Sequence, residues 1–227
     1  MELAHLKSFV ELGTRFLKPP DVLHRELAGI RALLFDWDGV FNDGWRDASG
    51  GSPFSEVGSM GVNLLRFTLW QRDKKRIPCG VITGQQNSQA ERFTEREKFD
   101  HLFMGFTNKP AAFEEFLRHH GLEGRQVAFF YDDILDLPIA RRCGLRIMIR
   151  RPNGPLFEDH VVAKGDADIL TRFSGGENGL REACELLVGL AGNAGAMIEH
   201  RVRYSDLYQE YLADRSKVER SISRNQR

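Results

Sequence analysis

The chain has 227 residues, enough for one α/β domain with additional segments or for two very small domains. Hydrophobic residues make up 41% of it and charged residues 28%, so it can bury a core and lacks the composition of a disordered protein. Its 32 basic and 32 acidic residues cancel, which argues against a protein that binds nucleic acid through a large basic excess. No apolar run approaches the length of about 18 residues that a membrane-spanning helix needs.

Three cysteines, Cys79, Cys143 and Cys184, lie far apart and form no Cys-x-x-Cys pair, so they suggest neither a zinc site nor a disulfide framework. Residues 1–28 are expected to form an N-terminal helical arm, interrupted at Lys18-Pro19-Pro20-Asp21 because proline cannot continue a helix. The arm begins with an amphipathic pattern and not with the apolar core of a signal peptide. We therefore expect a soluble, cytoplasmic protein.

Residues 29–191 alternate between short apolar runs and helical patterns. The runs, which predict buried strands, lie at 32–35, 77–82, 102–104, 127–131 and 145–149. The helical patterns lie at about 60–73, 86–98, 108–120 and 134–143. This alternation predicts an α/β domain, in which a Rossmann-like parallel sheet has helices on both faces.

Two segments interrupt or extend this pattern. Residues 41–58 are rich in turn-forming residues and predict a β-hairpin flap after the first strand. Residues 192–227 predict a C-terminal helical extension, with one helix at about 196–222. We interpret its apolar stripe as a subunit-packing surface and the basic residues from Arg215 onward as a solvated, frayed end. We interpret His119-His120 as a cationic helix end and not as metal ligands.

The candidate catalytic residues lie where the strands end. In a parallel sheet, reactive groups gather beyond the carboxyl ends of the strands. Asp36 and Asp38 follow the first strand; the later ends carry Thr83-Gly84, Lys109, Asp132-Asp133 and Asp136. Two carboxylates in one crevice repel each other unless a cation lies between them, and oxygen ligands without His or Cys favour Mg2+.

Together these residues supply the parts for phosphoryl transfer: a carboxylate nucleophile, a hard metal ion, and Thr83 and Lys109 to stabilise the phosphoryl oxygens. Each also has a purely structural explanation. An Asp after a strand is often a helix cap, and Asp133 and Asp136 can serve as an Asx turn and a favourable charge at a helix start. Their joint occurrence at successive strand ends is what favours a catalytic site.

The same segments resemble the motifs of the haloacid dehalogenase superfamily of phosphotransferases. The matching segments are Phe35-Asp36-Trp37-Asp38-Gly39-Val40, Val81-Ile82-Thr83-Gly84, Lys109 and Asp132-Asp133-Ile134-Leu135-Asp136. Response-regulator receivers use a similar set of Asp, Thr and Lys, but there the Lys comes last. Here Lys109 precedes the Asp132 cluster, which is the order found in the phosphatases.

Over residues 29–190 the chain is similar to the capless, tetrameric 3-deoxy-D-manno-octulosonate 8-phosphate phosphatase family. The likeness extends to the segment that follows Asp38, to Asn108-Lys109-Pro110 and to Ser174-Gly175-Gly176-Glu177-Asn178-Gly179-Leu180-Arg181-Glu182. From the residues alone, we expect Ser174-Gly175-Gly176 to form a tight turn before a helix.

The resemblance implies a role for each motif residue. Asp36 would attack phosphorus and become an aspartyl phosphate, and Asp38 would protonate the leaving alcohol and then activate water. Thr83, Gly84 and Lys109 would hold the phosphoryl oxygens. Asp36, the main-chain carbonyl of Asp38, and Asp132 would bind Mg2+, assisted by Asp133 and Asp136. The implied substrate is a small phosphorylated sugar or 2-keto-3-deoxy sugar acid, and the implied assembly is a homotetramer that helps the flap to close the site.

Three positions depart from that family's pattern. Gln85 stands where arginine is usual, Val57-Gly58-Ser59 where arginine-aspartate-glycine is usual, and Tyr131 where glycine is usual. These departures leave open a non-catalytic oligomerisation or regulatory domain. A third alternative, within enzymes, is transfer to an acceptor other than water or cleavage of a carbon–halogen bond. The intact Asp38 favours catalysis, and Lys109 with Asp132-Asp133 favours phosphate.

Overall fold

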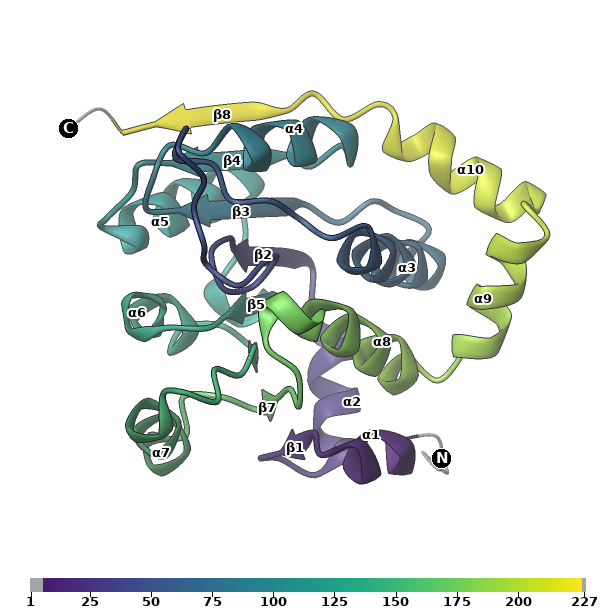
Figure 1. The fold of residues 1–227 in the computed structure, drawn as a ribbon. Helices are drawn as coiled ribbons and strands as arrows, with labels where there is room; N and C mark the ends of the chain where they lie inside the picture. The colour runs from purple at the N-terminus through teal and green to yellow at the C-terminus, as the bar shows by residue number, and fades with distance from the viewer. Residues whose placement is uncertain (1–5, 226–227) are drawn as a thin grey trace.

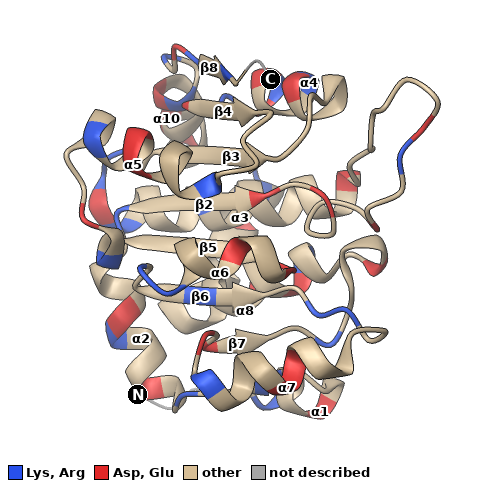
Figure 2. Cartoon of the chain, turned by 90° about the vertical axis from the view of Figure 1, so that its left-hand side faces the viewer, with Lys and Arg blue, Asp and Glu red and all other residues tan. Residues whose placement is uncertain are grey.

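The computed structural model describes residues 6–225, and a sheet of eight strands runs through its centre (Figure 1). The strands are β1 (Arg15–Phe16), β2 (Ala32–Asp36), β3 (Cys79–Thr83), β4 (His101–Met104), β5 (Val127–Tyr131), β6 (Leu145–Met148), β7 (Ile169–Leu170) and β8 (Ser221–Arg224). Their order across the sheet is β1-β7-β6-β5-β2-β3-β4-β8, seen as a stack from β8 at the top to β7 near the bottom in Figure 2.

All neighbouring strands pair in parallel except β1, which is antiparallel to β7. Strand β2 lies between β3 and β5, so the carboxyl ends of these three strands are adjacent. The sheet thereby places the residues that follow each of them at one edge, where we expected the active site.

Helices cover both faces of the sheet, and the prediction of an α/β fold is confirmed (Figure 1). One face carries α2 (Pro20–Gly29), α3 (Glu56–Asp73), α4 (Ser88–Arg96) and α8 (Gly179–Ala191), and the other carries α5 (Lys109–His120), α6 (Leu137–Ala140) and α7 (Pro155–Lys164). Each face of the sheet has its own hydrophobic core, and β2 contributes side chains to both. Leu33 and Phe35 pack on the face of α3 and α8, and Leu34 packs on the face of α5. Within residues 6–225 no large cap domain is inserted.

The expected β-hairpin flap at 41–58 is not formed. Residues 41–55 contain no strand, and α3 begins earlier than expected, at Glu56. Backbone hydrogen bonds join Asp47 to Gly51 and Gly50 to Asp47 at the tip, at 2.8 and 2.9 Å, and side chains make further bonds to the backbone there. The Asp47 carboxylate accepts hydrogen bonds from the Ser49 and Gly51 amides at 2.8 and 2.9 Å, and the Asn42 side chain accepts one from Gly44 at 2.8 Å. The segment is therefore an irregular loop, which we call the 41–55 loop.

The C-terminal segment is not one helix. It forms α9 (Ala194–Val202) and α10 (Asp206–Arg215), separated by a turn in which Tyr204 has a φ of 47°. The rings of Tyr208 and Tyr211 are buried, with centroids 5.2 and 5.4 Å from that of Phe67 in α3. Tyr208 and Tyr211 thus pack within the chain and not at a subunit surface, whereas Tyr204 of the same stripe is 58% exposed.

Both terminal segments add an edge strand to the sheet. The basic end that we expected to fray forms β8 along β4, where Arg224 pairs with Glu91 at 2.7 Å and the Ser223 hydroxyl donates to Glu115 at 2.6 Å. At the other end, α1 (Lys7–Leu12) stops at Gly13, and β1 follows before α2 starts at Pro20. The part of the expected arm in residues 1–5 lies outside the described residues.

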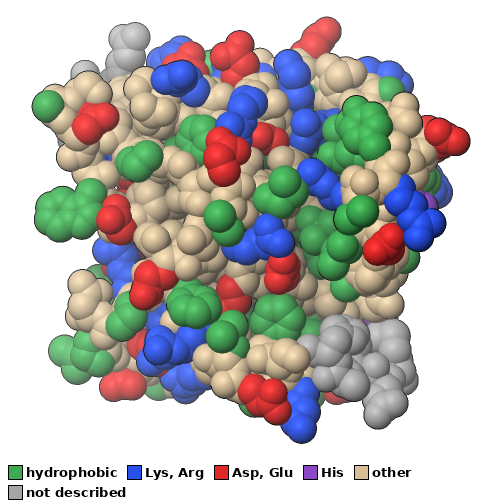
Figure 3. Space-filling model, turned by 45° about the vertical axis from the view of Figure 1, so that its right-hand side comes forward, with side chains coloured by type: hydrophobic (Ala, Val, Ile, Leu, Met, Phe, Trp, Pro, Cys, Tyr) green, Lys and Arg blue, Asp and Glu red, His purple; other side chains and the backbone are tan. Residues whose placement is uncertain are grey.

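Charges of both signs are interspersed on the face shown in Figure 3, in keeping with the neutral composition. Among the helices of residues 6–225, none is long and apolar enough to cross a membrane.

Candidate active site

Three buried carboxylates meet at the carboxyl edge of the sheet. Asp36 ends β2, Asp132 directly follows β5, and Asp136 ends the short 3-10 helix Ile134–Asp136. One oxygen from each lies within 4.8 Å of the other two. The parallel pairing of Phe35 with Phe130 brings the first two together, and the short turn folds the third back over them.

Lys109 joins this cluster from the first turn of α5. Its Nζ donates hydrogen bonds to Asp36 Oδ1 and Asp136 Oδ1, each at 2.6 Å. Burial opposes the charge of Lys109, but the two carboxylates outweigh burial and hold its pKa above the ordinary value. The ammonium is therefore a permanent positive charge in the crevice.

The cluster still carries more negative charge than its neighbours balance. Arg151 pairs with Asp132 Oδ2, but Asp132 Oδ1 is buried and has no hydrogen-bond partner among residues 6–225. Burial, followed by repulsion from Asp36 and Asp136, raises the pKa of Asp132 well above its usual range. Burial and repulsion from Asp36 also raise the pKa of Asp136 to about 7, against the attraction of Lys109. An unpartnered oxygen in an oxygen-only cluster fits a hard divalent cation.

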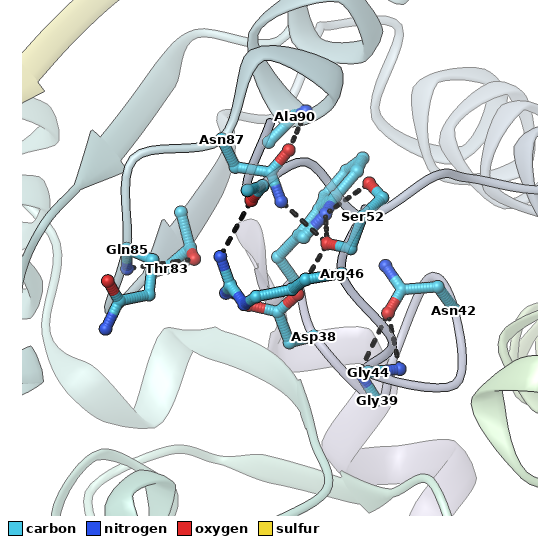
Figure 4. A network of polar contacts seen from close by, with 12 residues as sticks. Asp38, Gly39, Asn42, Gly44, Arg46, Ser52, Thr83, Gln85, Asn87 and Ala90 are labelled. Atoms are coloured by element: carbon cyan, nitrogen blue, oxygen red, sulfur yellow. Dashed lines mark hydrogen bonds and ion pairs between the residues drawn. The ribbon is translucent and has the colours of Figure 1, made fainter. Parts of the chain in front are cut away.

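The side chain of Asp38 faces the 41–55 loop (Figure 4). Ser52 Oγ donates a hydrogen bond to Asp38 Oδ1 at 2.5 Å, and the Arg46 guanidinium pairs with Oδ2. Ser52 is held in turn by Asn87 Nδ2 at 2.7 Å. The loop and the N-cap of α4 thus fix the carboxylate that the sequence predicts to be the acid and base.

Two glycines, Gly39 and Gly175, let neighbouring segments lie close to the backbone that follows Asp38. Gly39 has a φ of 87°, and a Cβ there would clash with Asp132 Oδ2. A Cβ on Gly175 would clash with the carbonyl oxygens of Gly39 and Asn42. The segment around Gly175 forms the expected tight turn before α8 and packs against the active-site loop. A pocket of about 330 Å³ opens beside it, lined by Gly39, Arg151 and Glu177 among others.

The predicted phosphate-holding residues lie on the neighbouring strand. Thr83 ends β3, one position beyond the residue that pairs with Asp36, and it is buried. Its Oγ1 accepts a hydrogen bond from the Gln85 amide at 3.4 Å across Gly84, and the Gln85 side chain is exposed at the crevice (Figure 4).

The remaining family departures do not alter the carboxylate cluster. The Tyr131 hydroxyl donates to the Asp166 carbonyl at 3.0 Å and its ring packs in the core on the side of α5 to α7, so this ring does not narrow the crevice. Ser59 in α3 donates to Glu97 at 3.0 Å. Asp133 is exposed and accepts a hydrogen bond from the Ile134 amide at 2.7 Å, which is the capping role considered from the sequence.

Sequence reasoning missed two arginines, Arg46 and Arg151. Arg151 comes shortly after β6, so its position beyond a strand end was a usable signal. Arg46 offered none, because its contact with Asp38 depends on the irregular path of the 41–55 loop.

A central parallel sheet with a carboxylate and lysine cluster at its carboxyl edge is the arrangement expected from the resemblance to the haloacid dehalogenase phosphatases. No family model matches the chain. The chain is 29% identical over 167 residues, 70% of its own length and 79% of the relative's, to 3-deoxy-D-manno-octulosonate 8-phosphate phosphatase of Escherichia coli K12.

Solved structures of phosphatases have a fold similar to that of this chain. A probable YrbI family phosphatase from Pseudomonas syringae has a TM-score of 0.65 at 28% identity, covering 82% of this chain and 98% of that one. The 3-deoxy-D-manno-octulosonate 8-phosphate phosphatase of Yersinia pestis has a TM-score of 0.62 at 26% identity, covering 77% and 89%. In sequence and fold the chain is therefore similar to phosphatases of the haloacid dehalogenase superfamily, to which a solved structure from Legionella pneumophila at 26% identity and a TM-score of 0.64 is also assigned.

Proposed function

We propose that this protein is a Mg2+-dependent phosphomonoesterase that forms an aspartyl phosphate on Asp36. Its proposed substrate is a small phosphorylated sugar or 2-keto-3-deoxy sugar acid. The observation that carries the proposal is the convergence of Asp36, Asp132 and Asp136 around Lys109, with one buried Asp132 oxygen left without a partner in residues 6–225. The relatives named as phosphatases of 3-deoxy-D-manno-octulosonate 8-phosphate support the choice of substrate.

The residues that would hold Mg2+ are Asp36, Asp132, Asp136 and the main-chain carbonyl of Asp38. Asp136 enters this set because its carboxylate shares the 4.8 Å cluster with the other two. When bound, Mg2+ supplies positive charge that offsets the repulsion between the carboxylates and stabilises the phosphoryl oxygens.

The reaction proceeds in two displacements. Lys109 fixes Asp36 Oδ1, and the Asp36 carboxylate attacks phosphorus while the bond from phosphorus to the alcohol oxygen breaks. Asp38, protonated at this stage, gives its proton to the leaving oxygen. Asp38 then takes a proton from water, the water oxygen attacks phosphorus, and the bond to Asp36 breaks to release inorganic phosphate. Thr83, Gly84 and Lys109 hold the phosphoryl oxygens.

Arg46 supplies the positive charge that Gln85 lacks. Its guanidinium comes from the 41–55 loop and lies between Asp38 and Gln85 in Figure 4. A guanidinium binds a carboxylate or phosphate through two parallel hydrogen bonds. We propose that Arg46 moves from Asp38 to the carboxylate of the substrate when an anionic substrate enters. This movement frees Asp38 for proton transfer.

The proposed assembly is a homotetramer, and the proposed location is the cytoplasm. Ile134 and Leu135, which follow Asp133 at the site, are 62% and 64% exposed. Two adjacent apolar side chains beside a site open to solvent support a contact with another subunit. The location remains a prediction from the sequence.

A second candidate function is a non-catalytic domain. The pairing of Arg151 with Asp132 favours it, because a guanidinium can replace part of the charge of a metal ion. The two functions predict different responses to Mg2+, since only the phosphatase requires it for turnover.

The test is phosphate release from a panel of phosphorylated sugars and sugar acids, including 3-deoxy-D-manno-octulosonate 8-phosphate, with Mg2+ or with a chelator. We expect Mg2+-dependent release, with the highest kcat/KM for substrates that carry a carboxylate. Purified protein that releases no phosphate from any member of the panel would favour the non-catalytic domain. Equal kcat/KM with and without the substrate carboxylate would reject the sugar-acid assignment alone.

A further inference from the structure

Three histidines cluster at the edge of the sheet opposite the carboxylates. His101 is the first residue of β4, and His119 and His120 are the last two residues of α5. One ring nitrogen of each lies within 4.8 Å of the other two. The ring centroids are 4.5, 4.9 and 4.9 Å apart. The sequence places His101 far from the other two, so the pair His119-His120 gave no sign of the third ring.

The cluster contains buried nitrogens without partners. His101 is 3% exposed, and its Nδ1 has no hydrogen-bond partner among residues 6–225. The same holds within that range for Nε2 of His120. A buried polar atom left unpaired costs free energy, and such atoms are few in native proteins. Two of them in one cluster point to a ligand.

Aromatic packing accounts for only part of this arrangement. The His101 ring stacks on Phe103 with centroids 5.5 Å apart and meets the edge of Phe116 at 5.7 Å, which explains why its faces are buried. It does not explain why a nitrogen of each of three rings approaches the others. The nearby Asp100 carboxylate is engaged elsewhere, because it accepts a hydrogen bond from the Cys79 amide at 2.8 Å.

We propose that His101, His119 and His120 bind one divalent late-transition metal ion, such as Zn2+, with a fourth position open to water. Imidazole nitrogens are the ligands that Zn2+, Cu2+ and Ni2+ favour, and a three-histidine set with one open position is a known zinc geometry. Bonds of about 2.0–2.1 Å in a tetrahedron separate the nitrogens by about 3.4 Å. The nitrogens lie within 4.8 Å of one another without a metal ion, so binding requires the rings to draw closer, and His119 is the exposed one of the three.

The environment keeps the rings in the form that binds metal. Burial and the charges of the two neighbouring histidines lower the pKa of His101 to about 4, and burial lowers that of His120. Neutral rings offer a lone pair to a metal ion. The bound ion would fasten the end of α5 to the start of β4, and α5 is the helix whose first residue, Lys109, reaches Asp36.

The test is a Zn2+ titration of the full chain in excess Mg2+, in competition with a chromophoric chelator. The variants are His119→Ala, which removes an exposed ligand, and His101→Phe, which keeps an aromatic ring. His160→Ala is the matched control, because His160 is an exposed histidine on α7. Wild type and His160→Ala should each bind one more Zn2+ than His119→Ala and His101→Phe. The same difference should persist in an Asp132→Asn background, which separates this site from the carboxylate cluster.

A second readout is the visible d–d absorption of Co2+, which reports a nitrogen-rich tetrahedral environment. We expect the band in wild type and its loss in His119→Ala. Equal Zn2+ stoichiometry and affinity in wild type and His119→Ala would overturn the proposal. If His101→Phe fails to fold, His119→Ala alone decides, because an exposed side chain at the end of α5 is not needed for the core.

Discussion

The Nζ of Lys109 lies 2.6 Å from Oδ1 of Asp36, and this contact joins the start of α5 to the end of the central strand β2. The contact fixes one oxygen of the proposed nucleophile and places a permanent positive charge where the phosphoryl group would arrive. Lys109 comes long after Asp36 in the chain, so the pair exists only because β2, β3 and β4 lie side by side.

Lys109→Met removes this charge while keeping most of the aliphatic stem. Losing one stabilising donor at a reaction centre typically lowers kcat about 100- to 1,000-fold, and we expect a loss of this size. Steady-state kinetics measure it, and circular dichroism checks that the fold is retained. Activity within tenfold of wild type would show that Lys109 is only a structural partner of Asp36 and Asp136.

Asp136→Asn removes one charge from the carboxylate cluster. If Asp136 helps to hold the metal, the Mg2+ concentration for half-maximal activity should rise about 10- to 100-fold, with much of the activity recovered at saturating Mg2+. Asp133→Asn is the control, because Asp133 is exposed and caps the same turn. An unchanged Mg2+ requirement in Asp136→Asn would remove this residue from the metal site.

Arg46→Ala tests how the substrate is recognised. Charge-assisted hydrogen bonds contribute about 1.5–3 kcal/mol, so kcat/KM should fall about 10- to 100-fold for a substrate with a carboxylate. It should change much less for a sugar phosphate without one. Arg92→Ala, at an exposed position on α4, serves as the control for loss of a surface charge. An equal loss on both substrates would indicate that Arg46 acts only through Asp38.

Glu97→Gln tests a buried contact that joins the end of α4 to α3 and α10. Glu97 accepts hydrogen bonds from Asn63 at 2.6 Å and Ser59 at 3.0 Å, and Arg96 and Arg215 lie nearby. Burial raises the pKa of Glu97, but the Asn63 hydrogen bond and the two arginines outweigh burial and lower it overall.

A carboxylate with a lowered pKa in the folded state stabilises the protein above its unfolded pKa, and this contribution is lost as pH falls through the folded value. Glu97→Gln should therefore reduce the free energy of unfolding by about 1–3 kcal/mol at pH 7. The difference from wild type should begin to shrink as pH falls below the unfolded Glu pKa of about 4.3, and it should be lost only below the lowered pKa of the folded state. Urea unfolding across this pH range measures this, and a difference independent of pH would contradict the assignment.

The sequence predicted the parts of the site that depend on strand ends. Asp36, Thr83 and Asp132 follow apolar runs that the periodicity identifies, and a parallel sheet brings such residues to one edge. It did not predict the irregular 41–55 loop, in which Asp47 and Asn42 side chains accept hydrogen bonds from the backbone of residues two positions further on. Nor did it predict β1 and β8, which are short strands that depend on pairing with β7 and β4 from distant parts of the chain.

The measurement that tests the central claim most directly is phosphate release by wild type and Asp36→Asn, with Mg2+ or with a chelator, on one substrate that wild type hydrolyses. An amide in place of the Asp36 carboxylate keeps the shape of the site and removes the attacking oxyanion. We expect Asp36→Asn with Mg2+, and wild type with chelator, both to fall to the background rate. Substantial turnover by Asp36→Asn in the presence of Mg2+ would contradict an aspartyl phosphate on this residue.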